Sequence, residues 1–133
     1  MNRKFKYHRD GTTPTNGEIF TFGSNLNGYH RGGAAKEAHV NYGAIYGKAL
    51  GLYGQSYAIP TKDDFISSLS LDEIQKYVTV FTDFTYEHSE LEFFVTRIGC
   101  FLAGYKDADI APLFKGCNTN CSFANQWAYY LED

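Results

Sequence analysis

The chain of 133 residues is 44% hydrophobic and 20% charged and carries a formal net charge of −3. That length and balance are typical of a globular protein with a sizeable core, so we expect one domain over residues 1–133. The negative charge argues against a duplex nucleic-acid partner, which would require a basic face.

Three cysteines are few and odd in number, which does not favour a disulfide framework and indicates reduced thiols in a cytoplasmic protein. Cys117 and Cys121 have loose spacing and no second pair, so no metal or other cofactor is expected. The start of the chain is polar and basic, and no stretch approaches membrane-spanning length. We therefore expect neither a secretion signal nor a membrane partner.

In the first half of the chain, short apolar runs alternate with loops rich in Gly, Asn and Thr. The predicted elements are an edge strand at residues 4–8, a loop at 10–17, a strand at 18–22, a helix at 33–42 capped by Gly43, an irregular loop at 44–55 and a short buried strand at 56–60. Glycine recurs throughout the irregular loop, which is unfavourable for a helix and favours a shaped loop beside a ligand cleft.

The second half contains the strongest helix signal, at residues 71–86. Ser70 is the predicted N-cap, and Glu73 completes a capping box. One helical face carries the apolar residues Leu71, Ile74, Tyr77, Val78 and Phe81. A strand at 92–96, a brief helix at 107–113, a strand at 120–123 and a terminal turn or helix at 127–131 complete the prediction. Strands that alternate with helices imply a layered α/β fold.

A glycine-rich loop between the second strand and the first helix is the most informative segment, at residues 19–35. Gly23, Gly28, Gly32 and Gly33 allow the backbone to turn and to approach a ligand that a Cβ would exclude. Because a helix N-terminus presents free N–H groups, this geometry suits an anion such as phosphate. The dinucleotide-fold pattern and the P-loop pattern are both absent. The loop therefore predicts a nucleotide or phosphate site of another type.

Residues 93–105 repeat this arrangement, because an apolar strand again ends in a loop of small residues before a predicted helix. Two strand–loop–helix units place both loops on the same carboxyl edge of a mostly parallel sheet, which is where ligands of open α/β sheets bind. Two such loops side by side suit a diphosphate better than a single phosphate.

Three segments, taken in chain order, resemble the macro domain, the module that binds ADP-ribose. They are Gly23-Ser24-Asn25 with Gly32-Gly33-Ala34-Ala35, then Tyr57-Ala58-Ile59-Pro60-Thr61-Lys62, and then Thr96-Arg97-Ile98-Gly99-Cys100-Phe101-Leu102. The similarity is above all to small bacterial and phage macro-domain-like proteins and to the terminal ADP-ribose glycohydrolase type. The resemblance implies a three-layer α/β/α fold with a mixed, mostly parallel sheet.

The resemblance also implies a partner and a binding site. The partner is an ADP-ribose-type nucleotide or an ADP-ribosylated substrate. In the family the first loop holds the distal ribose, which here implies Gly23, Ser24, Asn25, Gly32, Gly33 and Ala34. The second loop wraps the diphosphate, which implies Arg97, Gly99, Cys100, Phe101, Leu102, Ala103, Gly104 and Tyr105.

The catalytic residues of the glycohydrolase type match only in part. In that type a lysine attacks the anomeric carbon, and an aspartate just after the second-loop segment assists. Lys62 stands where the lysine is expected, but Ala103 stands in place of the acid. Asp107 and Asp109 follow a few residues later and are candidates to replace it. His30 in the first loop is either a general base near neutral pH or a hydrogen-bonded loop histidine.

Several candidates have a structural interpretation that the sequence leaves open. Asn25 binds ribose hydroxyls or stabilises a turn. Lys62 acts in the site, or it is a surface lysine paired with neighbouring carboxylates. Arg97 lies in an apolar strand, and we expect it to pair with a carboxylate such as Asp63 rather than only to order the second loop. Tyr105 covers the ligand or packs in the core.

Three functions are compatible with the resemblance. The first is hydrolysis of an ADP-ribosyl glycosidic linkage, with Lys62 or His30 as acid–base or nucleophilic groups. The second is capture of a nucleotide without turnover, as in a phage protein that sequesters an NAD-derived immune signal. The third is a domain that kept the fold and lost the pocket. Ala103 favours binding, whereas Lys62 and His30 keep catalysis open.

Overall fold

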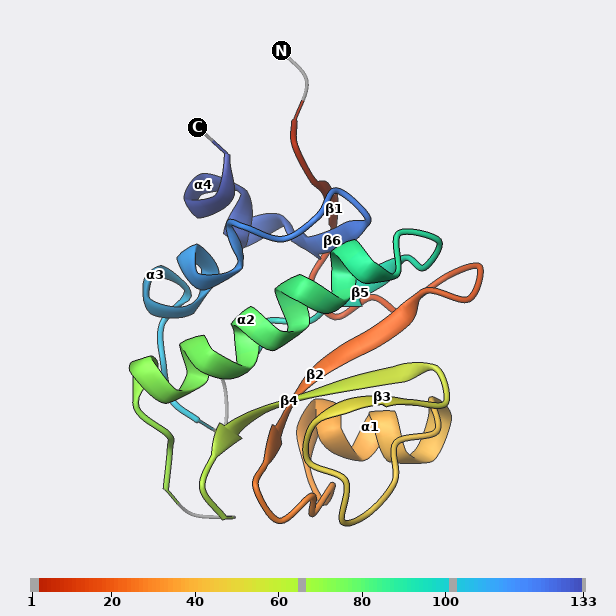
Figure 1. Ribbon diagram of the computed structural model, residues 1–133, viewed down its shortest axis with the longest axis vertical. Helices are drawn as coiled ribbons and strands as arrows, with labels where there is room; N and C mark the ends of the chain where they lie inside the picture. The colour runs from red at the N-terminus through yellow and green to blue at the C-terminus, as the bar shows by residue number, and fades with distance from the viewer. Residues whose placement is uncertain (1–2, 65–66, 101–102, 133) are drawn as a thin grey trace.

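Six strands form one sheet through the middle of the computed structural model, which describes residues 3–64, 67–100 and 103–132. Their order along the sheet is β1-β6-β5-β2-β4-β3 (Figure 1). The strands are β1 Lys6–His8, β2 Ile19–Asn25, β3 Gly51–Tyr53, β4 Ser56–Lys62, β5 Phe93–Val95 and β6 Cys121–Ala124. Neighbouring strands run parallel, except that β3 and β4 are antiparallel. The sheet is therefore mixed and mostly parallel, with β1 at its edge, as predicted.

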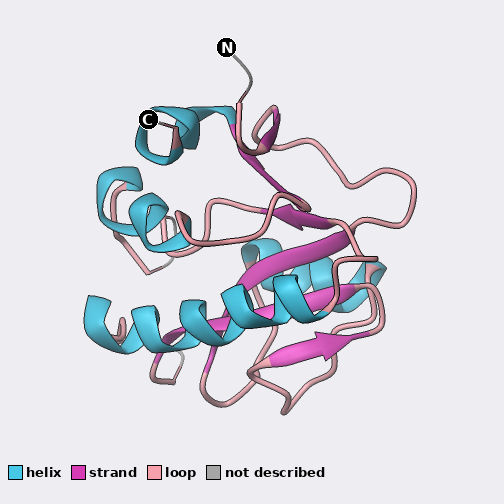
Figure 2. Ribbon diagram, turned by 45° about the horizontal axis from the view of Figure 1, so that its top comes forward, coloured by secondary structure: helices cyan, strands magenta, loops and turns pink. Residues whose placement is uncertain are grey.

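Helices cover both faces of the sheet (Figure 1, Figure 2). The helical segments are α1 Gly33–Asn41, α2 Leu71–Glu87, α3 Asp107–Ile110 and α4 Ala128–Leu131, with the 3-10 segments η1 Ala111–Phe114 and η2 Asn125–Trp127. α1 lies against one face, and α2, α3 and α4 lie against the other, which gives three layers. Within the described residues, no helix is both long enough and apolar enough to cross a bilayer.

Alternate residues of β2 enter two separate cores, because successive side chains of a strand point to opposite faces of the sheet. Ile19 belongs to the larger core beneath α2, α3 and α4, which includes Phe81 and Trp127. Phe20 and Phe22 belong to a smaller core beneath α1. In the described part of the chain α1 is the one helix on this second face, so part of the face is left uncovered.

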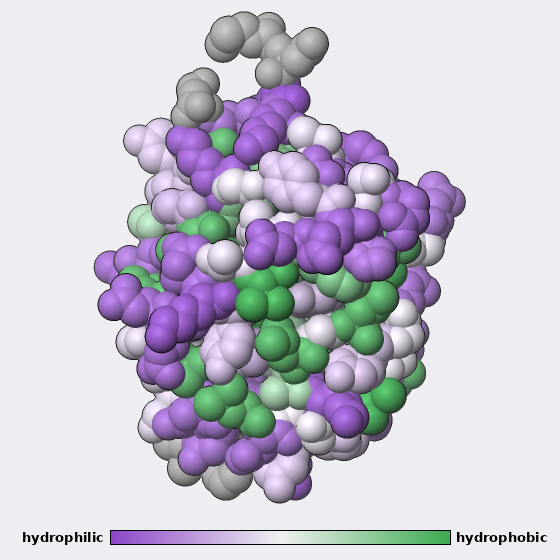
Figure 3. All heavy atoms as spheres, viewed as in Figure 1, coloured by the Kyte–Doolittle hydropathy of each residue, from purple (hydrophilic) through white to green (hydrophobic). Residues whose placement is uncertain are grey.

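The N-terminus of α2 forms the predicted capping interaction. The Ser70 hydroxyl accepts a hydrogen bond from the Glu73 N–H at 3.2 Å and donates one to the Glu73 carboxylate at 3.2 Å. Ile74, Val78 and Phe81 are buried, which confirms the predicted apolar face. Figure 3 shows the side of the molecule that α2 covers, where apolar side chains form a broken band between polar ones.

Four elements differ from the prediction. β2 and β4 are longer than expected, because each supplies ladder partners for the other as far as Asn25 and Lys62. β3 lies inside the stretch predicted to be irregular, and it pairs with β4 through a tight turn that contains Gly54 at φ 59°. The predicted helix at 107–113 is two short segments, α3 and η1, with Pro112 at the start of the second.

Candidate functional site

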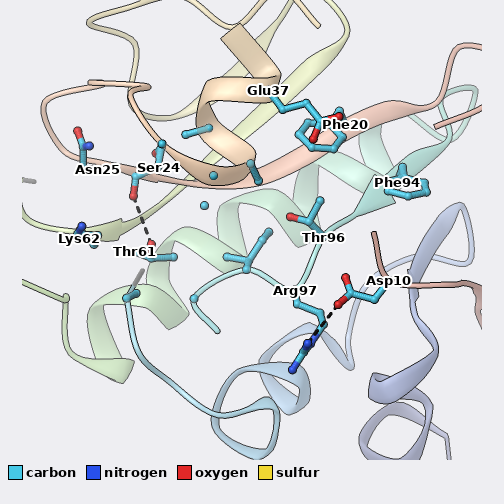
Figure 4. A pocket seen from close by; sticks show the side chains of 18 of the residues that line it. Asp10, Phe20, Ser24, Asn25, Glu37, Thr61, Lys62, Phe94, Thr96 and Arg97 are labelled. Atoms are coloured by element: carbon cyan, nitrogen blue, oxygen red, sulfur yellow. Dashed lines mark hydrogen bonds and ion pairs between the residues drawn. The ribbon is translucent and has the colours of Figure 1, made fainter. Parts of the chain in front are cut away.

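The carboxyl ends of β2, β4 and β5 meet at one edge of the sheet (Figure 1). A Cβ on Gly23 in β2 would stand 3.3 Å from the hydroxyl oxygen of Thr61 in β4 and 3.5 Å from the side chain of Ile98 after β5. The Thr61 hydroxyl donates a hydrogen bond to the carbonyl oxygen of Ser24 at 3.3 Å (Figure 4). A Cβ on Gly99 would in turn lie 3.9 Å from Thr61. The two glycine-containing loops therefore adjoin at one rim.

A cavity of about 670 Å³ opens between these loops, α1 and the segment after β1. This is within the roughly 300–1,000 Å³ range of small-molecule sites. The predicted site residues that line it are Gly23, Ser24, Asn25, Gly32, Gly33, Ala34, Lys62, Arg97, Gly99 and Ala103. Those that do not are His30, Cys100, Gly104 and Tyr105. Phe101 and Leu102 lie outside the described residues.

The N-terminus of α1 faces this cavity. Its N-cap residue, Gly32, has no side chain that could cap the first amides, and the first turn contains no acidic residue. Gly33 has φ 55°, in the left-handed region that favours glycine. Ala34 and Ala35 follow on the same wall of the cavity. Because the first N–H groups of a helix lack intrahelical partners and carry the positive end of the dipole, this wall suits an anion.

A second segment, residues 44–50, clamps the first loop from outside and is called the clamp segment below. The Gly47 N–H donates to the Gly28 carbonyl at 3.0 Å, and the Ser24 hydroxyl donates to the Ala49 carbonyl at 2.5 Å. Gly28 has φ 69°, and a Cβ there would stand 2.6 Å from the backbone nitrogen of Lys48. Only glycine fits at position 28, and the close backbone contact there fixes the position of the first loop.

Asn25 forms the turn that the sequence offered as one of its two roles. Its side-chain amide donates to the Tyr29 carbonyl at 2.9 Å, and its side-chain oxygen accepts from the Tyr29 N–H at 2.9 Å. The residue is buried yet lines the cavity. A turn role and a place on the rim of the cavity are therefore both present.

His30 lies beneath the first loop and is only 1% exposed. Its Nε2 lies 3.0 Å from the Ile45 carbonyl oxygen and donates a hydrogen bond to it in the neutral tautomer that carries the proton on Nε2. The His30 ring contacts the Phe22 ring edge-on. The Tyr46 hydroxyl donates to the His30 carbonyl at 3.1 Å. Burial lowers the pKa of His30. The structure thus places this histidine in the support of the loop rather than in the cavity where a general base would act.

Lys62 ends β4 on the rim of the cavity, which Ala103 also lines. The two acids that the sequence offered as replacements lie elsewhere. Asp109 accepts a hydrogen bond from the Lys106 N–H at 3.1 Å at the start of α3. Asp107 accepts from the Trp127 indole at 2.8 Å. Neither lines the cavity, so neither replaces the missing acid beside Lys62.

Arg97 pairs with carboxylates, as expected, but the partner predicted for it was wrong. Its guanidinium contacts Asp107 through two hydrogen bonds of 2.9 and 2.8 Å and Asp10 through one of 3.1 Å, not Asp63 (Figure 4). The hydrogen bonds with Asp107 raise the pKa of Arg97. Burial alone would raise the pKa of Asp107, but the hydrogen bonds from Arg97 and Trp127 together hold this pKa below its ordinary value. The charge of Arg97 is therefore balanced within the protein.

Two residues of the second loop belong to the larger core rather than to the cavity. The Tyr105 hydroxyl donates to the Leu69 carbonyl at 2.5 Å, and its ring packs on the core beneath α2. Cys100 packs on the same core, and burial raises the pKa of its thiol to about 12. For Tyr105 the structure thus favours core packing over a ligand cover.

One end of the cavity is aromatic, and it was not predicted. Phe20 and Phe94 are register partners in β2 and β5, with ring centroids 6.3 Å apart and planes 16° apart. His8 stacks on Phe94 at 3.8 Å and 17°, and burial lowers the pKa of His8. Asp10 and Glu37 also line the cavity. Phe20 has an alternation signal in the sequence, whereas His8 reaches the site only because β1 pairs with β6.

Figure 4 shows how these groups are distributed. Phe20, Phe94 and Glu37 lie toward one end of the cavity, and Asn25 and Lys62 lie toward the other. Among the described residues there is no group of three or more His, Cys, Asp or Glu side chains that could hold a metal ion. The cavity thus has an aromatic end with carboxylates and a glycine-rich end with a lysine.

Comparisons with known proteins support the fold. No protein-family model and no curated protein matches the chain. Among solved structures, the chain is similar to Thermosipho africanus DarTG in complex with ADP-ribose, with a TM-score of 0.60 and 12% sequence identity. The match covers 81% of this chain and 38% of that one, so the chain spans well under half of the length of its neighbour. The similarity confirms the macro-domain-like α/β/α fold that the resemblance implied.

Proposed function

We propose that the protein binds ADP-ribose, or a related NAD-derived nucleotide, in the cavity between the two glycine-containing loops. The observation that carries the proposal is the N-terminus of α1, which opens onto a cavity of about 670 Å³ with no capping side chain and no acidic residue in its first turn. The similar DarTG structure contains ADP-ribose, which supports this ligand for a shared fold.

In this proposal the diphosphate lies between the first turn of α1 and the turn at Gly99. Backbone N–H groups and the helix dipole stabilise its negative charge there. Arg31 and Lys62 line the cavity and add positive charge. Arg97 adds little, because Asp10 and Asp107 already balance it.

The two ends of the cavity suit the two ends of such a ligand. The aromatic end, formed by Phe20, Phe94 and His8, suits a flat nucleobase. The rim at Ser24 and Asn25 offers polar groups to the distal ribose. A ligand of this kind therefore meets apolar, anion-binding and polar groups in the order in which its own parts occur.

Binding without turnover is the version that the geometry favours. Covalent attack by Lys62 needs a neighbouring acid to accept and return a proton. Ala103 stands where that acid is expected, and Asp107 and Asp109, which follow it, do not line the cavity. His30 is buried under the loop. Capture of an NAD-derived signal by a phage protein is a setting in which binding alone suffices.

Hydrolysis is the second candidate function, and one specific observation supports it. Lys62 lines the cavity at the carboxyl end of β4, where an amine can reach the anomeric carbon of a bound ribose. This version requires an ADP-ribosylated substrate whose leaving group departs without protonation by an acidic side chain.

Isothermal titration calorimetry tests the binding proposal. We expect ADP-ribose to bind in a one-to-one complex, ADP to bind more weakly, and adenosine to bind most weakly because it lacks the phosphates. Lack of any heat from ADP-ribose at millimolar concentration would refute the proposal. Turnover is tested separately, by incubation with ADP-ribosylated protein and nucleic acid and comparison of wild type, Lys62→Ala and the control Lys76→Ala. Release that depends on Lys62 would establish the hydrolytic version.

A further inference from the structure

We propose that Glu37 selects the nucleobase by accepting hydrogen bonds from its N–H edge, and that the site accepts guanine at least as well as adenine. The inference rests on the proposed function, because it concerns the aromatic end of the same cavity. It names the substrate class more closely than the fold does, as a purine nucleotide with N–H donors on the edge that faces α1.

The position of Glu37 follows from the helix. Residues three and four apart lie on one helical face, so Glu37 shares its face with Gly33 and Ala34, which form the anion-binding wall. All three line the cavity. A carboxylate one turn farther along α1 stands beyond the phosphates and toward the end where Phe20 and Phe94 lie (Figure 4). Its distance from the first turn weakens its repulsion of a diphosphate bound there.

The carboxylate of Glu37 is available to a ligand. Within the described residues, no hydrogen bond and no ion pair holds it. The other cavity-lining carboxylate, that of Asp10, accepts a hydrogen bond from Arg97 at 3.1 Å. Glu37 is half-buried, so it keeps partial access to solvent in the free protein. A half-buried carboxylate that faces an apolar wall gains most from a partner with N–H donors.

The wall beside it is flat and apolar. Phe20 and Phe94 are buried side chains on the sheet, with ring planes 16° apart. Tyr42 stacks on Phe20 with ring centroids 4.7 Å apart, and His8 stacks face to face on Phe94 at 3.8 Å. In the proposal the base packs on this aromatic stack through the cavity-lining ring of His8, whatever its substituents, because every base has a π face. Stacking therefore supplies affinity without choosing the base, and the choice falls to the polar group at the edge.

A carboxylate discriminates between purines by the donors that they present. It only accepts hydrogen bonds, and it has two oxygens. Guanine presents its ring N1–H and its 2-amino group side by side, so both oxygens are satisfied at once. Adenine presents one amino group next to the acceptor N1, so one oxygen faces a lone pair. A base without its preferred contact leaves a half-buried charge unpaired, which costs affinity.

The test is a calorimetric comparison of ADP-ribose and GDP-ribose on wild type, Glu37→Gln and the control Glu87→Gln. The glutamine that replaces Glu37 keeps the size of the side chain but exchanges one acceptor oxygen for a donor. Glu87 is an exposed glutamate at the end of α2, on the other face of the sheet. Thermal melting of the three proteins checks that each is folded.

We expect GDP-ribose to bind wild type at least as tightly as ADP-ribose, and Glu37→Gln to weaken GDP-ribose tenfold or more while it changes ADP-ribose less. Glu87→Gln should leave both ligands unaffected. The inference is overturned if ADP-ribose binds wild type and GDP-ribose binds it more weakly, or if Glu37→Gln leaves the affinity for GDP-ribose unchanged. If neither nucleotide binds wild type, the proposed function itself fails and the inference with it, and that result is distinct from selective loss of GDP-ribose.

Discussion

Replacement of Ala34 by glutamate should move the stability of the fold and the affinity for ADP-ribose in opposite directions. Ala34 is the second residue of α1, which begins at Gly33 and has no acidic residue in its first turn. A carboxylate there interacts favourably with the helix dipole. The same carboxylate stands on the wall where we place the diphosphate, so it repels the ligand. Glutamine at this position has nearly the same size without the charge.

The two effects differ in size. A carboxylate in the first turn of a helix stabilises by about 0.3–1 kcal/mol at low salt. A unit charge at roughly 5 Å from a phosphate, with an effective dielectric constant near 20, costs about 3 kcal/mol, which weakens binding on the order of 100-fold. We therefore expect Ala34→Glu to be slightly more stable than Ala34→Gln and to bind ADP-ribose far more weakly.

Urea denaturation and isothermal titration calorimetry measure the two quantities on the same preparations. The comparison is between the Glu and Gln variants, because both add the same bulk to a half-buried position. Equal ADP-ribose affinity in the two variants would show that the first turn of α1 does not hold the phosphates. Raising the salt concentration should shrink both differences, since exposed charges are screened.

Lys62→Ala should lower ADP-ribose affinity about threefold to tenfold in calorimetry, because a cavity-lining positive charge is lost, with Lys76→Ala unchanged; equal affinity would make Lys62 a surface lysine. Asp107→Asn should lower the free energy of unfolding by about 2–4 kcal/mol, since it breaks a paired carboxylate that also binds an indole N–H. The pKa of Asp107 is depressed in the folded state, so its contribution to stability is complete above its ordinary value of 3.8 and is lost as pH falls through the lower folded value. Denaturation at several pH values should therefore show a constant difference in the free energy of unfolding between wild type and Asp107→Asn from about pH 5 to 8, and a smaller difference below about pH 4. A difference that stays constant down to about pH 2 would contradict this. Gly28→Ala should weaken ADP-ribose binding tenfold or more, because a Cβ would meet the clamp segment at 2.6 Å; Gly17→Ala, with a similar φ and nothing within 4 Å, should keep full affinity, and equal losses would place the effect in backbone strain alone.

The parts of the fold that local chemistry determines could be read from the sequence. The capping residues Ser70 and Glu73 mark the start of α2 whatever surrounds them. The first loop is similarly local, because Gly33 needs a backbone conformation that other residues rarely adopt. Strand, loop and helix follow one another within a few residues there, so the position of the loop and of the start of α1 was predictable.

The parts that long-range pairing determines could not be read in this way. Arg97 and Asp10 are separated by 87 positions, and nothing local to either residue indicates the pair. His8 carries no signal until β1 joins the sheet beside β6. His30 stands in a glycine-rich stretch that predicts a loop, and it is nevertheless buried because the clamp segment closes over it. β3 was missed because its pairing with β4 outweighs the poor strand propensity of its glycine.

The contact between Gly28 and Gly47 has a kinetic consequence. Two backbones that touch without side chains fix the first loop beside the cavity before any ligand arrives. The first loop therefore has no ordering step on binding, so we expect differences among ligands to appear mainly in how long each one stays.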